Sequence, residues 1–323
     1  MDKTLSIIIP AYNEEKTIAL VLDNLKNIDY PETEIIVCLD GCTDRTKEIV
    51  NQYSNVSMIE NENKLGKIAT IEKAFKVCKG NIIIVHDSDW ILHYEKGGIK
   101  KLIECFDDSR VGGLHFPNHF PFLDSREGIR TIKDFAFLGR VWWAKFIHDY
   151  QIKYQTKNIV DKLYVNEEKM SFPFLINIFR KDLIGSLKTT HDDAEFTIQI
   201  LQKGYLIRVI DRTFPYFSNR DNAAKTRDIF KKKTKGRIGW SQIRKTYKRS
   251  FFSMYPKILC YGIINSFRTK TIKSFLAVYY YIILTAIHLL FYKMKYLFKP
   301  EPNVEEAWGY LTKRYMNNTE EVR

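Results

Sequence analysis

Residues 5–10 read LSIIIP, an unbroken apolar run that ends at a proline. Such a run is typical of a strand that is covered on both faces in a parallel sheet. The residues that follow, 14–27, carry Ile18, Leu22 and Leu25 at helical spacing. The chain is therefore expected to open with a buried strand and a helix, the first step of a βαβ repeat.

The same alternation continues to residue 85. Further strands are predicted at 34–39, 56–60 and 81–85, and further helices at 44–53 and 67–78. Three successive crossovers of this length require right-handed connections and an open, mostly parallel, Rossmann-like α/β sheet with helices on both faces. Ligands of such sheets bind beyond the carboxyl ends of the strands, so we expect the chemistry just after residues 10, 39 and 85.

The middle of the chain is less regular, and its end is basic. Strands are predicted at 111–116, 172–179 and 205–210, and helices at 126–154 and 192–203. We expect a catalytic domain over residues 1–222 and a helical, membrane-associated region over residues 223–323.

The net charge of +13 over 323 residues suggests an anionic partner, for which nucleic acid, membrane lipid and phosphorylated substrates all qualify. Lys and Arg crowd residues 225–299, whereas residues 1–120 mix both signs. Five cysteines without paired spacing fit a reducing cytosol. The apolar residues at the N-terminus end at Pro10, a pattern of a strand and not of a secretory h-region. We therefore expect the catalytic part to be cytosolic.

Acidic turns follow the predicted strands. Asp40 and Asp44 come after the second strand, and Asp87 and Asp89 come after the fourth. Two carboxylates at i and i+2 beyond a buried strand suit one Mg²⁺ ion that is shared with phosphate oxygens. Asp-Ser-Asp is also an ordinary turn sequence, which is the alternative interpretation.

Three segments, LSIIIPAYNEEKTI, EIIVCLDGCTDRTKEIV and NKLGKIATIEKAFKVCKGNIIIVHDSD, together resemble the inverting family-two glycosyltransferases of GT-A fold. The resemblance is strong over residues 4–90. It is weaker at residues 176–180 and in HDDAEFTIQILQKGYLIRVI, residues 191–210. It implies a GT-A domain that transfers a sugar from a nucleotide donor.

The resemblance also implies a donor site. The residues that would contact the nucleotide-sugar are Pro10, Ala11, Tyr12, Glu14, Asp40, Lys67, Asp87 and Ser88. Asp89, with Asp87, would bind Mg²⁺ or Mn²⁺. The family often has a second acid where this chain has Leu39. The nucleobase of the donor is therefore left open: UDP is the first choice, and GDP is the second.

Asp192 and Asp193 resemble the acceptor motif of the family, with Asp193 as the catalytic base. A carboxylate that accepts the proton of a hydroxyl assists its attack on the anomeric carbon. The alternative is a helix N-cap followed by a favourable acid. Arg180, Arg237 and Trp240 are weaker candidates for contacts with the acceptor or diphosphate, and a plain basic helix with one anchored Trp is the alternative for the last two.

Residues 274–291 are apolar, with Lys and Arg on both flanks. Three interpretations stay open: a helix on an anionic cytosolic leaflet, a single span, or a core helix. Residues 251–267 form a shorter apolar segment that Pro256 is expected to split.

The leading hypothesis is therefore an inverting glycosyltransferase at the cytoplasmic face of a membrane, peripheral or single-pass, acting on a hydroxyl of a lipid-linked or surface glycan. A polyprenyl-phosphate acceptor is the alternative. A nucleic-acid-binding protein is disfavoured, because the basic residues flank apolar runs and acidic turns repel phosphate. A catalytically dead sensor is disfavoured by the intact Asp87, Asp89 and Asp193.

Overall fold

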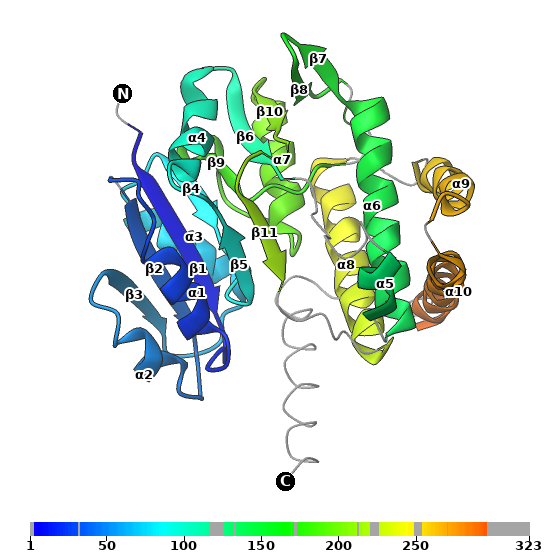
Figure 1. The fold of residues 1–323 in the computed structure, drawn as a ribbon. Coiled ribbons are helices and arrows are strands. Elements are labelled where there is room, and N and C mark those ends of the chain that lie inside the picture. The colour runs from blue at the N-terminus through cyan, green and yellow to red at the C-terminus, as the bar shows by residue number, and fades with distance from the viewer. Residues whose placement is uncertain are drawn as a thin grey trace. The chain divides into compact units, whose positions relative to one another are not determined.

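The computed structural model describes residues 3–31, 33–116, 126–131, 134–168, 170, 173–211, 213–219, 226–248, 254–269 and 271–295 (Figure 1). The chain forms two compact units. Unit 1 contains residues 1–119, 151–187 and 192–221, and unit 2 contains residues 120–150, 188–191 and 222–323. The last division lies beside the boundary predicted at 222, but residues 120–150 and 188–191 group with the second unit rather than the first.

Unit 1 is built on a nine-stranded sheet in the order β3-β2-β1-β4-β9-β6-β10-β8-β7. Its strands are β1 Leu5–Ala11, β2 Thr33–Asp40, β3 Val56–Asn61, β4 Ile82–Val85, β6 Val111–His115, β7 Lys157–Ile159, β8 Lys162–Val165, β9 Ile178–Arg180 and β10 Leu206–Val209. The helices are α1 Ile18–Leu25, α2 Thr46–Val50, α3 Lys67–Val77, α4 Gly98–Glu104 and α7 Asp192–Gln202, with 3₁₀ turns η1 Cys105–Asp107 and η3 Lys181–Leu183. A separate pair joins β5 Trp90–His93 to β11 Tyr216–Asn219.

The first half confirms the predicted parallel sheet. β1 pairs in parallel with β2 and β4, and β2 pairs in parallel with β3. Ile7, Ile8 and Ile9 are wholly buried, because β1 lies inside the sheet with neighbours on both sides. The apolar run that opens the chain therefore forms the centre of the parallel half of the sheet.

β9 departs from the expected pattern. A strand is predicted over 172–179, but only Ile178–Arg180 pairs, and it runs antiparallel to both β4 and β6. The segment before it, 173–177, is an extended loop held by side chains: Gln151 donates to the Pro173 carbonyl at 3.0 Å. The strand is short because side chains, those of Gln151 and Thr197, bind the carbonyls of Pro173 and Phe174 in place of a neighbouring strand.

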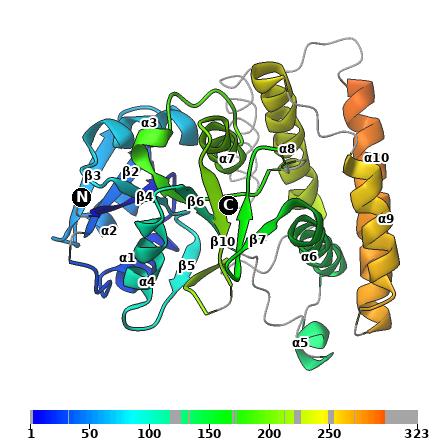
Figure 2. The same ribbon diagram turned by 90° about the horizontal axis from the view of Figure 1, so that it is seen from above.

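Unit 2 is helical. Its helices are α5 Arg126–Thr131, α6 Phe135–Gln155, whose last turn belongs to unit 1, α8 Thr226–Tyr247, α9 Met254–Ser266 and α10 Ile272–Lys295. The predicted helix over 126–154 is thus two helices. Figures 1 and 2 show α9 and α10 beside α6. Residues 251–253 of the predicted apolar segment lie outside the described residues. In the described part Pro256 does not interrupt the helix, because it occupies the first turn of α9, where its missing N–H has no intrahelical partner to lose.

Candidate active site

The turns that follow β1, β2 and β4 lie together at the carboxyl ends of these strands, which we call the carboxyl edge of the sheet. Ala11 pairs with Leu39 and Ile8 with Val85, so the three strands end side by side. Residues that leave these strands, including Tyr12, Asp40 and Asp87, therefore reach the same edge. The structure brings together the donor-side residues that the sequence predicts there.

Asp40 fixes the loop between β3 and α3. Its buried carboxylate accepts hydrogen bonds from the backbone N–H groups of Leu65 and Gly66, both at 2.8 Å, and from the Asn61 amide at 3.2 Å. Gly66 has φ +93°, a left-handed conformation that glycine adopts without strain. Asp40 thus shapes the wall of the predicted base site by holding this loop.

Tyr12 contacts the same loop through Lys64. The Lys64 ammonium lies over its ring, 3.2 Å from the centroid, and burial raises the pKa of the Tyr12 hydroxyl. Pro10 and Ala11 are the last residues of β1, and Ala11 is buried. The structure therefore places an aromatic face and a cation at the edge where a nucleobase is expected.

Glu14 and Ser88 contact each other at the same carboxyl edge. The Ser88 side chain is buried and hydrogen-bonds to Glu14, and the Thr17 hydroxyl donates to Glu14 at 2.7 Å. Burial raises the pKa of Glu14, the hydrogen bond from Thr17 opposes this, and the charge of Asp89 raises the pKa further. The carboxyl groups of Glu14 and Asp89 therefore repel each other, a setting in which a bound cation is favoured.

Lys67 links the donor side to α7. Its ammonium lies 2.8 Å from Asp87 and 2.9 Å from Asp192, and its side chain is only 24% exposed. Burial alone would lower the pKa of Lys67, but the carboxylates of Asp192 and Asp87 outweigh it and raise the pKa. Burial would likewise raise the pKa of Asp87, yet the Lys67 charge lowers it, so the group stays a carboxylate.

Asp192 and Asp193 begin α7, where the helix dipole favours negative charge. They differ in setting. The Asp192 side chain is 11% exposed and paired with Lys67, whereas Asp193 is half-buried and accepts the Ala194 N–H at 2.8 Å. The capping and catalytic interpretations are compatible in this geometry, because Asp193 faces the same cavity as Asp87.

That cavity has a volume of about 200 Å³. It is lined by Lys67, Val85, Asp87, Trp90, Phe116, Leu175, Ile176, Asn177, Asp192, Asp193 and Phe196. Sequence reasoning missed the apolar part of this lining and the loop 175–177. Trp90 directly follows Asp89, and this adjacency was the one available signal.

The predicted metal ligands fit an ion that is shared with substrate. Among the described residues, no three His, Cys, Asp or Glu side chains gather closely enough to hold a metal on their own. Asp87 and Asp89 instead supply two carboxylates from one turn. Mg²⁺ commonly binds through one or two carboxylates plus phosphate oxygens and water, so this set matches a diphosphate-bound ion.

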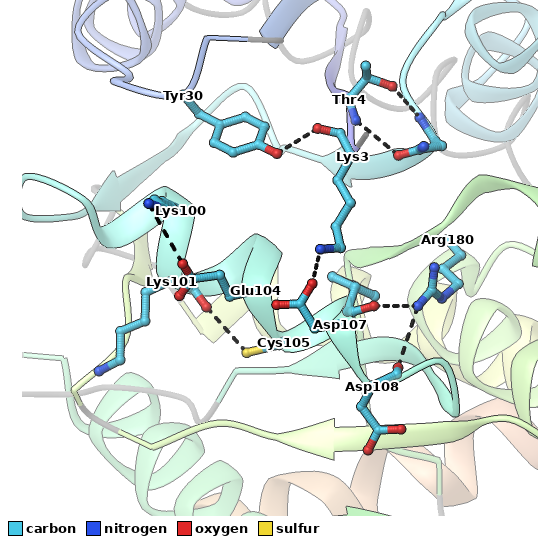
Figure 3. A network of polar contacts seen from close by, with 12 residues as sticks. Lys3, Thr4, Tyr30, Lys100, Lys101, Glu104, Cys105, Asp107, Asp108 and Arg180 are labelled. Atoms are coloured by element: carbon cyan, nitrogen blue, oxygen red, sulfur yellow. Dashed lines mark hydrogen bonds and ion pairs between the residues drawn. The ribbon is translucent and has the colours of Figure 1, made fainter. Parts of the chain in front are cut away.

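Arg180 lies elsewhere. It pairs with Ile82 at the start of β4, at the sheet edge opposite Asp87. Its guanidinium donates to the carbonyls of Val111 and Phe106. It also donates to the Asp108 carbonyl (Figure 3). In the same network Lys3 pairs with Asp107. Arg180 caps a helix end there, and its position gives no support to a contact with acceptor or diphosphate.

Arg237 and Trp240 lie in α8 of unit 2. Arg237 donates to His288 at 3.2 Å and lies over the Tyr292 ring. Trp240 stacks on His191, with ring centroids 4.5 Å apart. Their acceptor role stays a prediction.

An open, mostly parallel α/β sheet with this acid-lined carboxyl edge defines the class of GT-A enzymes. The sequence profile of glycosyl transferase family 2 matches residues 6–166, and over that range the chain belongs to this family. The mannosyltransferase PcManGT of Pyrobaculum calidifontis, solved with GDP-Man and Mn²⁺, has a similar structure. The TM-score is 0.56 at 16% identity, over 99% of this chain and 88% of that one, which shows the shared fold.

Two curated relatives are similar in sequence. Glycosyltransferase GlyA of Streptococcus pneumoniae is 30% identical over 181 residues, 54% of this chain and 24% of the relative. The dolichyl-phosphate beta-glucosyltransferase ALG5D of Trichomonas vaginalis is 32% identical over 146 residues, 39% of this chain and 44% of the relative. The matched stretch thus spans less than half of either relative.

Proposed function

We propose that the chain is an inverting glycosyltransferase that moves a sugar from a nucleoside diphosphate, UDP first and GDP second, to a hydroxyl of a lipid-linked or surface glycan. One observation carries this proposal. Asp87, Lys67 and the Asp192–Asp193 pair come from three separate segments and line one cavity at the carboxyl edge of the sheet. That groups so far apart in sequence line one cavity supports a single reacting centre for donor and acceptor.

The size of the cavity supports a division of the ligand. At about 200 Å³ it is smaller than the roughly 300–1,000 Å³ typical of a complete ligand pocket. It suits the transferred sugar and the attacking group. The nucleotide would then extend outward along Asp40 and Tyr12, which lie at the same edge.

Asp193 is assigned the proton transfer. It accepts the proton of the acceptor hydroxyl while the hydroxyl oxygen forms a bond to the anomeric carbon. The bond from that carbon to the diphosphate oxygen breaks, and the electron pair leaves with the nucleoside diphosphate. Attack from the face opposite the leaving group inverts the anomeric centre.

Lys67 holds the two carboxylates and offers positive charge where the diphosphate would develop negative charge. A divalent ion, Mg²⁺ or Mn²⁺, would neutralise the same diphosphate when bound at Asp89 and Asp87. Ser88, which lies between Asp87 and Asp89 in the sequence, is buried and contacts Glu14 through a hydrogen bond.

A polyprenyl-phosphate acceptor is the second candidate, favoured by the similarity to ALG5D. A phosphate acceptor is already anionic and needs no base, so the presence of Asp193 in the cavity favours the hydroxyl. Either acceptor places the enzyme at a membrane, and we propose its cytoplasmic face.

The test is a panel of nucleotide-sugars, each with Mn²⁺, screened for donor hydrolysis and for thermal stabilisation of the protein. We expect one uridine or guanosine diphosphate sugar to be hydrolysed slowly and to raise the unfolding temperature. A protein that responds to no member of the panel, with or without metal, contradicts the proposal.

A further inference from the structure

One face of α10 is apolar and exposed along its whole length. Its members recur every three or four residues, the period of one helix face. They are Ile272, Leu276, Tyr280, Ile283, Ile287, Leu290 and Met294, with exposed fractions from 38% to 79%. Ile264 on α9 is 63% exposed, and Phe267, which directly follows this helix, is 72% exposed. We call these nine residues the apolar stripe.

The opposite face of α10 is committed to unit 2. Ala277 and Val278 are wholly buried against Phe137 and Val141 of α6. The two helices approach so closely that a Cβ on Gly139 would lie 2.1 Å from the Ala277 carbonyl oxygen. The stripe is therefore not the inner face of a core helix.

The stretch of chain that carries the stripe is basic. Between Asp228 and Glu301 the chain has 16 Lys and Arg residues and no Asp or Glu. Lys257 on α9, Lys293 on α10 and Arg268 in the turn between the two helices are exposed. An apolar face on a segment whose charges are all positive is complementary to an anionic lipid surface.

We propose that α9 and α10 lie flat in the surface of an anionic bilayer, with the apolar stripe among the acyl chains and the basic residues at the headgroups. Within the described residues, Ile272–Met294 is the one helix long and apolar enough to cross a membrane. It does not cross. Its inner face packs on α6, which carries Arg140 and the Lys145–Asp149 ion pair, and a crossing would draw these charges into hydrocarbon.

Two other occupants fit the stripe less well. A second copy of this chain would bring two acid-free, basic surfaces together, and like charges repel. Nucleic acid would satisfy the cations but leave the apolar side chains in water.

The inference extends the proposed membrane location and does not depend on sugar transfer, so it is tested without substrates.

The test is co-sedimentation of the full chain with vesicles of phosphatidylglycerol and phosphatidylcholine, compared with phosphatidylcholine alone. Binding is expected to anionic vesicles, to weaken in high salt and to persist in part, because screening removes only the electrostatic contribution. The variant Ile283→Gln with Leu290→Gln should bind roughly tenfold more weakly. The matched control is Val77→Gln on α3, since Val77 and Ile283 are both 57% exposed, and it should bind as the wild type does.

Extraction decides between lying flat and spanning. Protein on vesicles should be released by alkaline carbonate, whereas retention until detergent is added would show a span and overturn the proposal. Equal binding by the stripe variant and the control would show a purely ionic surface, and a heparin column would then retain both equally. A concentration-dependent dimer that the stripe variant abolishes, without vesicle binding, would identify a second copy as the occupant. Each of these three outcomes contradicts the proposal.

Discussion

The ammonium of Lys67 lies 2.9 Å from a carboxylate oxygen of Asp192, a residue 125 positions later in the chain. The same ammonium contacts Asp87 at 2.8 Å. Asp87 follows β4 on the proposed donor side, and Asp192 is the first residue of α7 on the proposed acceptor side. One cation therefore joins the two halves of the candidate active site.

Lys67→Met and Asp192→Asn should each lower kcat and stability, because each leaves a partner's charge uncompensated. The double variant should lose less than the sum, with a coupling of about 0.5–3 kcal/mol in urea unfolding. The control cycle uses Lys47 and Glu60, an ion pair with side chains 48% and 44% exposed, for which the coupling should be about 0–1 kcal/mol. Strictly additive effects of the two substitutions would show that the ion pair between Lys67 and Asp192 contributes nothing to stability or activity.

Asp193→Asn should lower kcat by roughly 10²–10⁴, the usual contribution of a positioned base, while the nucleotide Kd stays the same. Steady-state kinetics and calorimetry of nucleotide binding measure the two effects separately. Retained kcat with Asn at this position would point to a phosphate acceptor, which needs no base.

Asp89→Asn should abolish metal-dependent nucleotide binding without unfolding the protein, because the turn accepts Asn. Binding of the nucleoside diphosphate is measured with Mn²⁺ and again with EDTA. Asp107→Asn is the control, since Asp107 pairs with Lys3 at the opposite edge of the sheet. Binding that is indifferent to EDTA in the wild type would remove the metal from the proposal.

Gly41→Ala should weaken nucleotide binding more than Gly97→Ala does. Both glycines have positive φ, +69° and +76°, so both substitutions cost backbone strain. A Cβ at Gly41 would also lie 2.6 Å from the backbone nitrogen of Lys64, whereas a Cβ at Gly97 meets nothing within 4 Å. Equal nucleotide Kd values for the two variants would show that the Lys64 loop plays no part in binding.

His86 predicts a loss of stability in acid. The side chain is fully buried, and burial lowers its pKa to about 4 from about 6.5 in the unfolded chain. Between these values the unfolded chain binds more protons, so stability falls as the pH falls from 6.5 toward 4. From pH 7.5 to 5 the loss should be about 2 kcal/mol. Urea unfolding of His86→Asn should lack this part of the pH dependence, and an unchanged slope would assign it to another group.

The donor half of the fold could be predicted from the sequence because its signals are local. A buried parallel strand such as 5–10 is continuous and apolar, and the acid turn that follows the fourth strand is adjacent to it. The rule that ligands bind beyond the carboxyl ends then places Tyr12, Asp40 and Asp87 together, and the strand register confirms this.

The acceptor half could not be predicted to the same extent. The ion pair between Lys67 and Asp192 depends on tertiary packing, which no local pattern records. Arg180 follows an apolar run just as the donor acids do, but β9 is antiparallel, so the end of this strand lies at the opposite edge. The strands β5 and β11, of four residues each, carry too little periodicity to be recognised.

The reversed direction of β9 has a consequence for how selectivity can change. The cavity is lined by residues that follow the parallel strand β4 and by residues that precede the antiparallel strand β9. The entering stretch, 173–177, is held by the Asn177 carbonyl, which accepts the Val85 N–H at 2.8 Å, and by Gln151 at Pro173. Its Leu175, Ile176 and Asn177 line the cavity and belong to no strand or helix. Under the proposed function, exchange of these three side chains would change the choice of acceptor while Asp40, Lys67 and Asp87 keep their contacts, so a new acceptor specificity would need changes in one short stretch only.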